Sequence, residues 1–347
     1  MSKRSSRLKS LAVVAAVMTL AAVGLWRAGK GRQPVYWEAR PLGIMGTETE
    51  LTAVAGPGRQ HILAKAITAA DAALRSVEAH MSTHLEDSEI SRFNAAQPGL
   101  AVPVSPETME VLEASRQLAE QTHRAFDVTC RPIVEVWTKA AKEDKLPAGA
   151  ELAAALALVG WDKIALRRRA VEKRAFSGGV DLGGIAKGYG IDRAVAAMKD
   201  AGAIGGLVDV GGDVRCFGRR PAGGKWRIGI RNPFTKDRTD LIGRLRLSRG
   251  AVCTSGNYER YWTIRGERYS HIVDPRTGRP VDEAPSVTVV APTAMVADAW
   301  ATALSVLGRD GLAMLPEGVE AMLVIGPPEN HTTVTSGGFD RFLEKPR

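Results

Sequence analysis

The part of the chain that follows Gly206 is a run of short strand-like segments, and this run constrains the fold more than any other feature. Segments such as GLVDVGGDVRCFG, WRIGIRNP and LIGRLRLS follow one another with only short connections. Several connections contain glycine and are too short for a crossover helix, so we expect neighbouring strands to pair antiparallel. Further strands are expected in AVCTS, ERYWTIRG, ERYSHIVD, PSVTVVAP, AMLVIG and HTTVTS.

Helical patterns precede and interrupt these strands. Apolar residues recur at helical spacing over 61–79, and Ser105 followed by Pro106 is typical of a helix start. Two more helices are expected, one over about 188–201 and one over 294–307. Strands in runs with helices between them indicate an α+β fold rather than a doubly wound parallel sheet.

The N-terminus has a different character. Seventeen uncharged and mostly apolar residues (10–26) follow a short basic stretch, as in a secretory signal. This segment is just long enough to span a bilayer, and the positive charge before it keeps that end in the cytoplasm. We therefore expect residues 1–27 to be a signal peptide or an uncleaved signal anchor, residues 28–40 a connector, and the remainder exported. No cysteine stands directly after the apolar run, which excludes lipid attachment of the bacterial lipoprotein kind.

The net charge of +9 suggests a nucleic-acid binder until its distribution is considered. Residues 1–40 hold eight basic residues and one acidic residue, so this stretch alone carries +7. The rest of the chain is nearly neutral, and we expect no nucleic-acid partner. The three cysteines form no C-x-x-C pair, so neither a disulfide scaffold nor a thiolate metal site is indicated.

A glycine-rich string, DLGGIAKG (181–188), directly precedes the third expected helix. Its adjacent glycines allow a ligand to approach the backbone, the helix N-terminus favours anions, and Lys187 adds a positive charge. A simple glycine turn with a solvated lysine would have the same pattern, so this string alone leaves both interpretations open.

A second string, ADAWATAL (297–304), places Asp298 and Thr302 four residues apart, on one face of the expected helix. A carboxylate and a hydroxyl suit Mg²⁺, which takes few protein ligands and completes its shell with phosphate and water. The alternative is a capping aspartate beside a half-buried threonine.

A third string, YSHIVDPRTGRPV (269–281), places His271 and Asp274 between the end of a strand and a Pro-Arg-Thr-Gly turn. A histidine in such a place can act as a general base near neutral pH. The alternative is a structural histidine that braces the turn.

Taken together, these strings resemble the ApbE family, the FAD:protein FMN transferases. The resemblance covers almost the whole chain after the leader and implies a tunnelling-type (T-fold) α+β domain over 41–347, exported to the bacterial periplasm. It is carried by eight blocks in the same order: MGT at 45–47, MSTHLEDSEISRFN at 81–94, AFDVTCRPIVEVW at 125–137, DLGGIAKGYGID at 181–192, VDVGGDV at 208–214, TSGNYER at 254–260, SHIVDP at 270–275 and the ADAWATAL helix.

The resemblance also implies an activity. Members of the family split the pyrophosphate of FAD, transfer FMN to a threonine hydroxyl of a target protein and release AMP. The family expectation for the target is the exported flavin-binding domain of a respiratory membrane complex. Mg²⁺ would be held by Asp298, Thr302 and the backbone oxygen of Gly184, and His271 would deprotonate the incoming threonine.

The other roles implied by the resemblance concern FAD itself. Lys187 would neutralise phosphate charge, and Asp181 would bind the cofactor near it. Asp274 is either a further catalytic residue or a residue that fixes the turn. His84 stands where the family commonly has a tyrosine, which puts the affinity for flavin in doubt. The flavin or adenosine pocket would be lined by Met45, Ala125, Phe126, Asp127 and Ile272.

Two other functions remain open at this point. One is an FAD pyrophosphatase, in which water replaces the threonine and free FMN is formed with AMP. The other is a periplasmic FAD-binding carrier without catalysis. The combination of Asp298, Thr302, Lys187 and His271 argues against a carrier, because binding alone needs no metal site. The same residues would serve the transferase and the pyrophosphatase.

Overall fold

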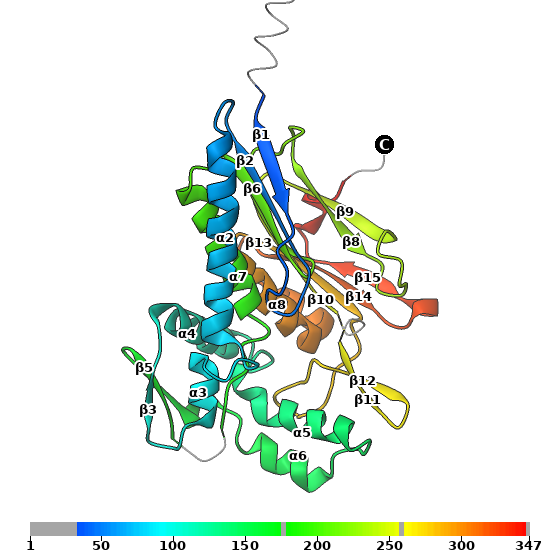
Figure 1. Ribbon diagram of the computed structural model, residues 1–347. Helices are drawn as coiled ribbons and strands as arrows, with labels where there is room; N and C mark the ends of the chain where they lie inside the picture. Colours follow the sequence, from blue (N-terminus) through cyan, green and yellow to red (C-terminus); the bar gives the residue numbers. More distant parts are fainter. Residues whose placement is uncertain (1–32, 175–177, 257–259, 345–347) are drawn as a thin grey trace, which may run out of the picture.

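The computed structural model describes residues 33–174, 178–256 and 260–344 (Figure 1). The expected signal segment, residues 1–27, lies outside these ranges, as do residues 28–32 of the expected connector. The remainder of the connector, residues 33–40, includes strand β1 (Val35–Ala39) of the central sheet. Across the described residues, no helix is both long and apolar enough to cross a membrane.

The central element is an eight-stranded sheet with the order β1-β2-β6-β7-β10-β13-β14-β15. Every neighbouring pair in it is antiparallel, which confirms the expectation drawn from the short connections. Its strands are β1 (Val35–Ala39), β2 (Thr49–Ala55), β6 (Gly205–Val210), β7 (Asp213–Gly218), β10 (Gly250–Gly256), β13 (Ser286–Ala291), β14 (Glu320–Ile325) and β15 (Thr332–Thr335).

Three helices cover one face of this sheet: α2 (Gln60–Met81), α7 (Ala186–Asp200) and α8 (Ala294–Leu307) (Figure 1). The expectations for 61–79 and 294–307 are confirmed. Helix α7 begins two residues earlier than expected, so Lys187 lies inside its first turn rather than before it.

The opposite face is covered by a separate hairpin, β8 (Trp226–Arg231) and β9 (Leu241–Leu247). Side chains alternate between the two faces along a strand. In β10, Ala251 and Cys253 accordingly join the core beneath the helices, whereas Val252 joins the core beneath this hairpin. The central strands of the sheet are therefore buried on both faces.

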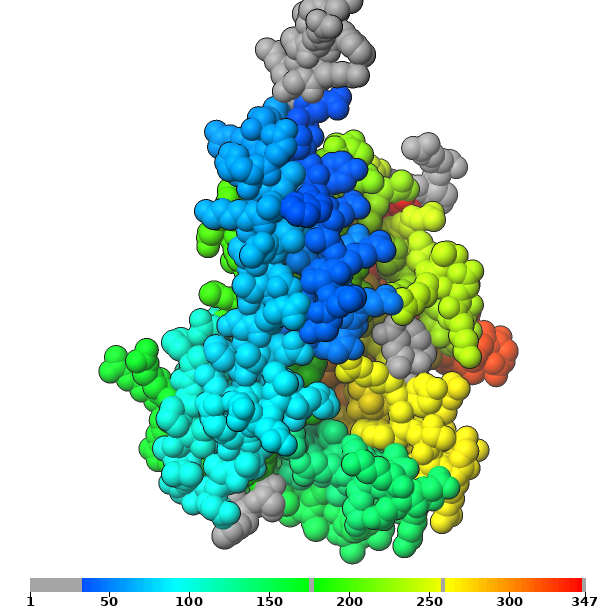
Figure 2. Space-filling model, in the orientation of Figure 1, coloured from blue at the N-terminus to red at the C-terminus, as the bar shows by residue number. Residues whose placement is uncertain are grey.

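The remaining elements gather at one end of the large sheet. They include α3 (Glu89–Ala95), α4 (Pro106–Gln121), α5 (Arg131–Lys142), α6 (Gly149–Leu156), the small sheet of β3 (Ala101–Pro103), β5 (Ala170–Lys173) and β4 (Ile164–Arg167), and the hairpin of β11 (Tyr261–Ile264) and β12 (Glu267–Ser270). Ser105 caps α4 by accepting a hydrogen bond from the backbone N–H of Thr108, as the Ser-Pro pattern predicts. Figure 2 shows α5, α6 and the β11–β12 hairpin side by side at this end, where Trp137 of α5 stacks on Trp262.

Candidate active site

Lys187, in the first turn of α7, forms an ion pair with the buried carboxylate of Asp213, the first residue of β7. A two-residue turn puts Asp213 there, since Gly211 and Gly212 join β6 to β7 with φ of +65° and +90°. Both positive φ values suit glycine in the hairpin turns that match strand twist. The second oxygen of Asp213 accepts a hydrogen bond of 2.9 Å from the backbone N–H of Thr254. Asp213 thus holds the ammonium group of Lys187 in place, and the Thr254 N–H in turn holds Asp213.

Helix α8 crosses α7 very closely at Gly188. A Cβ atom at this position would lie 2.8 Å from Cβ of Asp298 and would overlap the carbonyl group of Ala294. The backbone N–H of Gly188 donates a 2.9 Å hydrogen bond to Oδ2 of Asp298. Burial raises the pKa of Asp298, while the charge of Lys187 and this hydrogen bond act in the opposite direction. The crossing therefore brings Asp298, from a remote part of the chain, beside the glycine-rich string.

One turn further along α7, Asp192 holds the N-terminus of α8. Its two carboxylate oxygens accept hydrogen bonds from the backbone N–H groups of Ala294, at 2.7 Å, and Met295, at 2.9 Å. Arg215 donates a further bond of 2.7 Å to Asp192 Oδ1. A carboxylate at a helix N-terminus satisfies N–H groups that have no partner within the helix. Helix α8 is thereby attached to α7 at both Gly188 and Asp192.

The loop before α7 lies against the next turn of α8. A Cβ atom at Gly184 would lie 2.9 Å from Oγ1 of Thr302 and 3.4 Å from a ring carbon of Phe126. Within the described residues, the hydroxyl of Thr302 has no hydrogen-bond partner. Gly184, Thr302 and Asp298 are therefore brought to one place.

These groups fit a divalent cation in their chemistry. They offer one carboxylate, with one oxygen bonded to the Gly188 N–H, one hydroxyl and a nearby run of loop backbone. Mg²⁺ binds hard oxygen donors and keeps several water or phosphate ligands. Across the described residues there is no group of three or more His, Cys, Asp or Glu side chains suited to a metal ion. An ion here would accordingly depend on substrate phosphate and water for much of its shell.

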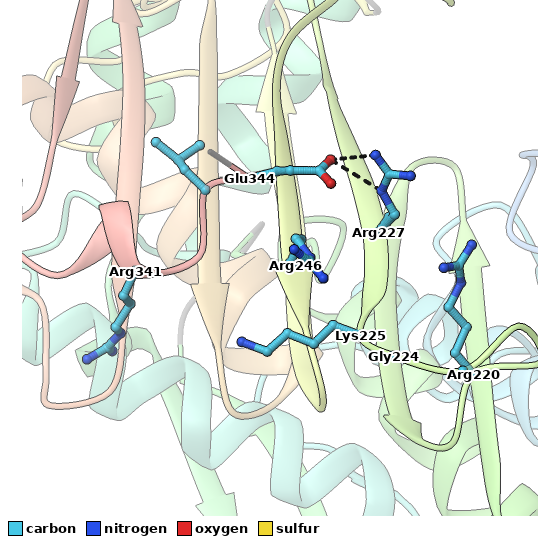
Figure 3. A pocket seen from close by; sticks show the side chains of 9 residues that line it. Arg220, Gly224, Lys225, Arg227, Arg246, Arg341 and Glu344 are labelled. Carbon is cyan, nitrogen blue, oxygen red and sulfur yellow. Dashed lines mark hydrogen bonds and ion pairs between the residues drawn. The ribbon is translucent and has the colours of Figure 1, made fainter. Parts of the chain in front are cut away.

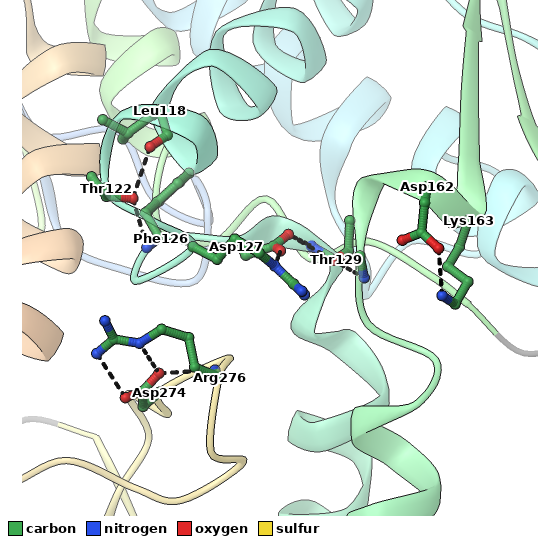
Figure 4. A network of polar contacts seen from close by, with 11 residues as sticks. Leu118, Thr122, Phe126, Asp127, Thr129, Asp162, Lys163, Asp274 and Arg276 are labelled. Carbon is green, nitrogen blue, oxygen red and sulfur yellow. Dashed lines mark hydrogen bonds and ion pairs between the residues drawn. The ribbon is translucent and has the colours of Figure 1, made fainter.

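The segment that carries Ala125 and Phe126 is buried, and Asp127 shapes it (Figure 4). Asp127 Oδ1 accepts hydrogen bonds from the backbone N–H and the hydroxyl of Thr129, at 3.0 and 2.6 Å. Its Oδ2 accepts a bond of 3.1 Å from Arg124. Both oxygens of Asp127 are therefore engaged inside the segment, and Phe126 is the member that reaches Gly184.

Asp181 begins the glycine-rich string and is tied to that segment, because its N–H donates a 2.8 Å hydrogen bond to the carbonyl of Val128. Its carboxylate accepts a 2.8 Å bond from the N–H of Gly183, which shapes the loop. Met45 reaches the same helix from another direction, and its terminal methyl lies against Gly190 of α7. Asp181 thus shapes the loop before α7, whereas Met45 contacts the helix itself.

His271 follows β12 immediately. Its Nδ1–H donates a 2.8 Å hydrogen bond to the backbone carbonyl of Arg260. A carbonyl can only accept, so Nδ1 carries a proton, and when the ring is neutral its basic lone pair is on Nε2. Ile272 is buried, and its N–H donates to Oγ of Ser270 at 3.1 Å. The local structure thus orients His271 with Nε2 as the basic atom.

Asp274 lies in the turn that follows (Figure 4). Its two carboxylate oxygens accept hydrogen bonds of 2.9 Å from Nε and Nη2 of Arg276. Its backbone carbonyl accepts a 2.8 Å bond from the N–H of Gly278. These contacts hold the turn, and within the described residues none joins Asp274 to Lys187 or Asp298.

His84 is exposed and lines a separate pocket of about 450 Å³, together with Thr83 and residues of α5 that include Arg131 and Glu135. Among the described residues, no contact joins His84 to the group around Asp298.

Two residues that organise the site, Asp213 and Asp192, are absent from the expectations drawn from sequence. Both lie inside blocks already singled out, VDVGGDV and DLGGIAKGYGID. The signal that could have found them is an acidic residue placed directly after a Gly-Gly turn, or on the buried face of a helix.

Comparison with known proteins gives one consistent family. Residues 45–323 match the ApbE family. The FAD:protein FMN transferase of Haemophilus influenzae is 34% identical over 284 residues, which are 79% of this chain and 82% of that protein. The structure of the flavin transferase ApbE from Vibrio cholerae is 31% identical, covers 90% of this chain and 100% of its own, and has a TM-score of 0.77. The ApbE protein of Thermotoga maritima has the same identity and coverage with a TM-score of 0.79.

Proposed function

Because the chain belongs to the ApbE family and is therefore a transferase, we propose that it transfers FMN from FAD to a threonine hydroxyl of a target protein and releases AMP. The observation that carries the proposal is the crossing of α7 and α8, where Lys187, Asp298 and Thr302 meet beside the glycine-rich loop. We assign the fold to the tunnelling class, with the antiparallel sheet and its covering helices as support.

The chemistry is one phosphoryl transfer. The threonine oxygen forms a bond to the phosphorus of the FMN half of FAD, and the bond from that phosphorus to the bridging oxygen breaks. AMP leaves with the electron pair, and His271 takes the hydroxyl proton on Nε2. Lys187, fixed by Asp213, balances negative charge on the phosphates.

Asp298, Thr302 and the backbone oxygen of Gly184 would hold Mg²⁺ at this place. When bound, the ion supplies charge neutralisation to the pyrophosphate. We further propose that FAD lies along the start of α7, against Met45, Asp181 and the segment of Ala125, Phe126 and Asp127, with Ile272 on the side of His271.

Mass spectrometry of a co-expressed candidate target tests the proposal. We expect a mass increase corresponding to FMN on a single threonine, absent when that threonine is replaced by valine. An enzyme variant with Asp298→Asn is the matched control and should leave the target unmodified. Free FMN with AMP and no adduct would instead identify an FAD pyrophosphatase. Bound FAD with no turnover would identify a carrier.

We also propose that the domain is exported and held at the periplasmic side of the inner membrane by residues 10–26. The basis is the +7 charge of residues 1–40 and the seventeen uncharged residues within them. The target would then be an exported flavin-binding domain of a respiratory membrane complex. Fractionation of cells tests this: full-length chain in the soluble cytoplasm contradicts export, and a soluble periplasmic form contradicts only the anchor.

A further inference from the structure

A strongly basic pocket lies on the side of the molecule that carries the β8–β9 hairpin (Figure 3). Its volume is about 510 Å³, and it is formed by the β7–β8 turn, the hairpin and the end of the chain. Five of the lining side chains are cationic and one is acidic: Arg220, Lys225, Arg227, Arg246, Arg341 and Glu344. None of these residues belongs to the site around Asp298.

The positive charge of this pocket is only partly neutralised. Arg227 and Arg246 are directly opposite each other in the hairpin, an arrangement that is destabilising for like charges. Glu344 accepts hydrogen bonds of 2.7 and 3.2 Å from Arg227. Among the described residues, Arg246, Lys225 and Arg220 form no ion pair. Repulsion between these cations remains in the folded protein. A bound anion would relieve it, so the pocket is suited to an anion.

The pocket lies at the end of the large sheet where the N-terminal segment joins the domain. Strand register aligns Val35 with Ala55, Val54 with Gly205, and Gly205 with Gly218. The turn that carries Arg220 follows Gly218 directly. Strands are spaced by about 4.8 Å, so β1 and β7, which are three spacings apart, are separated by about 15 Å. We call this end of the sheet the N-terminal edge.

Exposed apolar side chains lie at the same edge. Tyr36 and Trp37 of β1 are 53% and 48% exposed, and Ile204, before β6, is 40% exposed. Tyrosine and tryptophan are enriched where a protein meets the boundary between lipid and water. The N-terminal edge therefore combines cations with the aromatic side chains that favour a membrane interface.

We propose that the N-terminal edge rests on the membrane and that the basic pocket binds the phosphate headgroup of an anionic phospholipid. The inference rests on the proposed membrane attachment through residues 10–26. An acidic face of the target protein fits less well, because the pocket is remote from the transfer site. Lys187 and Lys199 are twelve residues apart on α7, which is about 18 Å, and Lys199 packs on Phe217 beside the edge.

Hydrogen–deuterium exchange on the full-length chain in lipid nanodiscs tests this proposal. In discs that contain phosphatidylglycerol, amide exchange over 219–227 and 244–249 should be slower than in discs of phosphatidylcholine alone. Each basic side chain near an anionic membrane surface increases the binding affinity by about fivefold. The double variant Lys225→Glu and Arg246→Glu should therefore abolish the difference between the two lipids.

The matched control reverses two exposed arginines at the other end of the molecule, Arg168→Glu and Arg169→Glu, in the β4–β5 turn. This control should keep the protection by phosphatidylglycerol. Two results would overturn the assignment of the pocket without affecting attachment to the disc. One is equal slowing of exchange in both lipids, and the other is equal loss of the phosphatidylglycerol effect in both double variants. Protection by inorganic phosphate or polyglutamate in phosphatidylcholine discs would overturn it too, in favour of a general anion site. A chain that enters neither disc and gains no protection from phosphatidylglycerol vesicles would reject both the attachment and the pocket.

Discussion

The backbone N–H of Gly188 donates a 2.9 Å hydrogen bond to Oδ2 of Asp298, which ties the first turn of α7 to α8. The two residues are 110 positions apart in the chain. A carboxylate removed from water needs a compensating partner, and this N–H together with Lys187 supplies it. The group proposed to hold the cation is therefore oriented before any substrate binds.

We expect Asp298→Asn to abolish FMN transfer while FAD binding and thermal stability change little. An amide oxygen can still accept the hydrogen bond from Gly188, but the negative charge for the cation is lost. Transfer should be measured across a magnesium titration. Full activity of this variant in chelating buffer would remove the metal from the proposal. Asp298→Ala loses the hydrogen bond as well and should also lower stability, by about 1–3 kcal/mol.

Gly188→Ala should destabilise the protein and lower transfer together. The added methyl would meet Cβ of Asp298 at 2.8 Å, and overpacking of this kind costs about 1–3 kcal/mol. Urea unfolding and transfer rates measure both effects. Gly149→Ala in α6 is the control, because a Cβ there meets nothing within 4 Å. It should be neutral or slightly stabilising. If Gly188→Ala were as stable and active as this control, the close contact between α7 and α8 at Gly188 would be contradicted.

The carboxyl group of Asp209 should make the free energy of unfolding depend on pH. Burial and the charge of Glu50, its cross-strand neighbour, raise the pKa of Asp209. The folded state therefore binds this proton more tightly than the unfolded state, and stability is lost as pH rises from the ordinary aspartate pKa through the raised one. Asp209→Asn keeps an acceptor for the Gly212 N–H and removes the ionisation. Its unfolding free energy relative to the parent should thus increase from about pH 4 to neutral pH.

Asp237 provides a control of opposite sign. Hydrogen bonds from the Thr239 hydroxyl and N–H lower the pKa of Asp237, so its contribution to stability is present above the ordinary pKa and lost in acid. Asp237→Asn should therefore lose more stability at neutral pH than at low pH. Chemical denaturation at several pH values tests both variants, and parallel curves for Asp209→Asn and the parent would contradict the assignment for Asp209.

The helices of the large core could be predicted because their signals are local. The Ser105-Pro106 start and the apolar spacing of 294–307 depend only on residues within a few turns. Helices α3, α5 and α6 were not expected from sequence. Helices α3 and α6 have only 7 and 8 residues. Helix α5 is longer, but its packing partners, such as Trp262 on Trp137, come from distant parts of the chain.

The residues of the candidate site fall into the same two groups, those with a local sequence signal and those that depend on distant packing. Asp298 and Thr302 lie one helical turn apart, so their shared face follows from spacing alone. Asp192 could not be assigned from spacing, because its partners Ala294 and Met295 are more than 100 residues away. Asp213 likewise depends on how the β6–β7 hairpin lies against α7. Long-range packing decides these contacts, and local propensity carries no information about it.

The last prediction concerns His271 as the general base. A threonine hydroxyl is a poor nucleophile at neutral pH, and removal of its proton in the transition state is worth about 10²–10⁴-fold in rate. The amide N–H of an asparagine side chain can still donate to the Arg260 carbonyl, as Nδ1–H does in the parent, but it offers no base. His271→Asn should therefore slow transfer by about that factor while FAD affinity and melting temperature change little.

The pH–rate profile distinguishes this role from a merely structural one. In the parent, the rate should fall in acid as Nε2 becomes protonated, because a protonated ring nitrogen cannot accept the hydroxyl proton. In His271→Asn this limb should disappear, because no imidazole remains to be protonated. If His271 only braces the turn, the variant should lose FAD affinity and thermal stability in step with activity, and its residual rate should keep the parent's acid limb. Transfer at nearly the parent's rate would contradict both roles, since it would show that neither the base nor the brace is needed for the reaction.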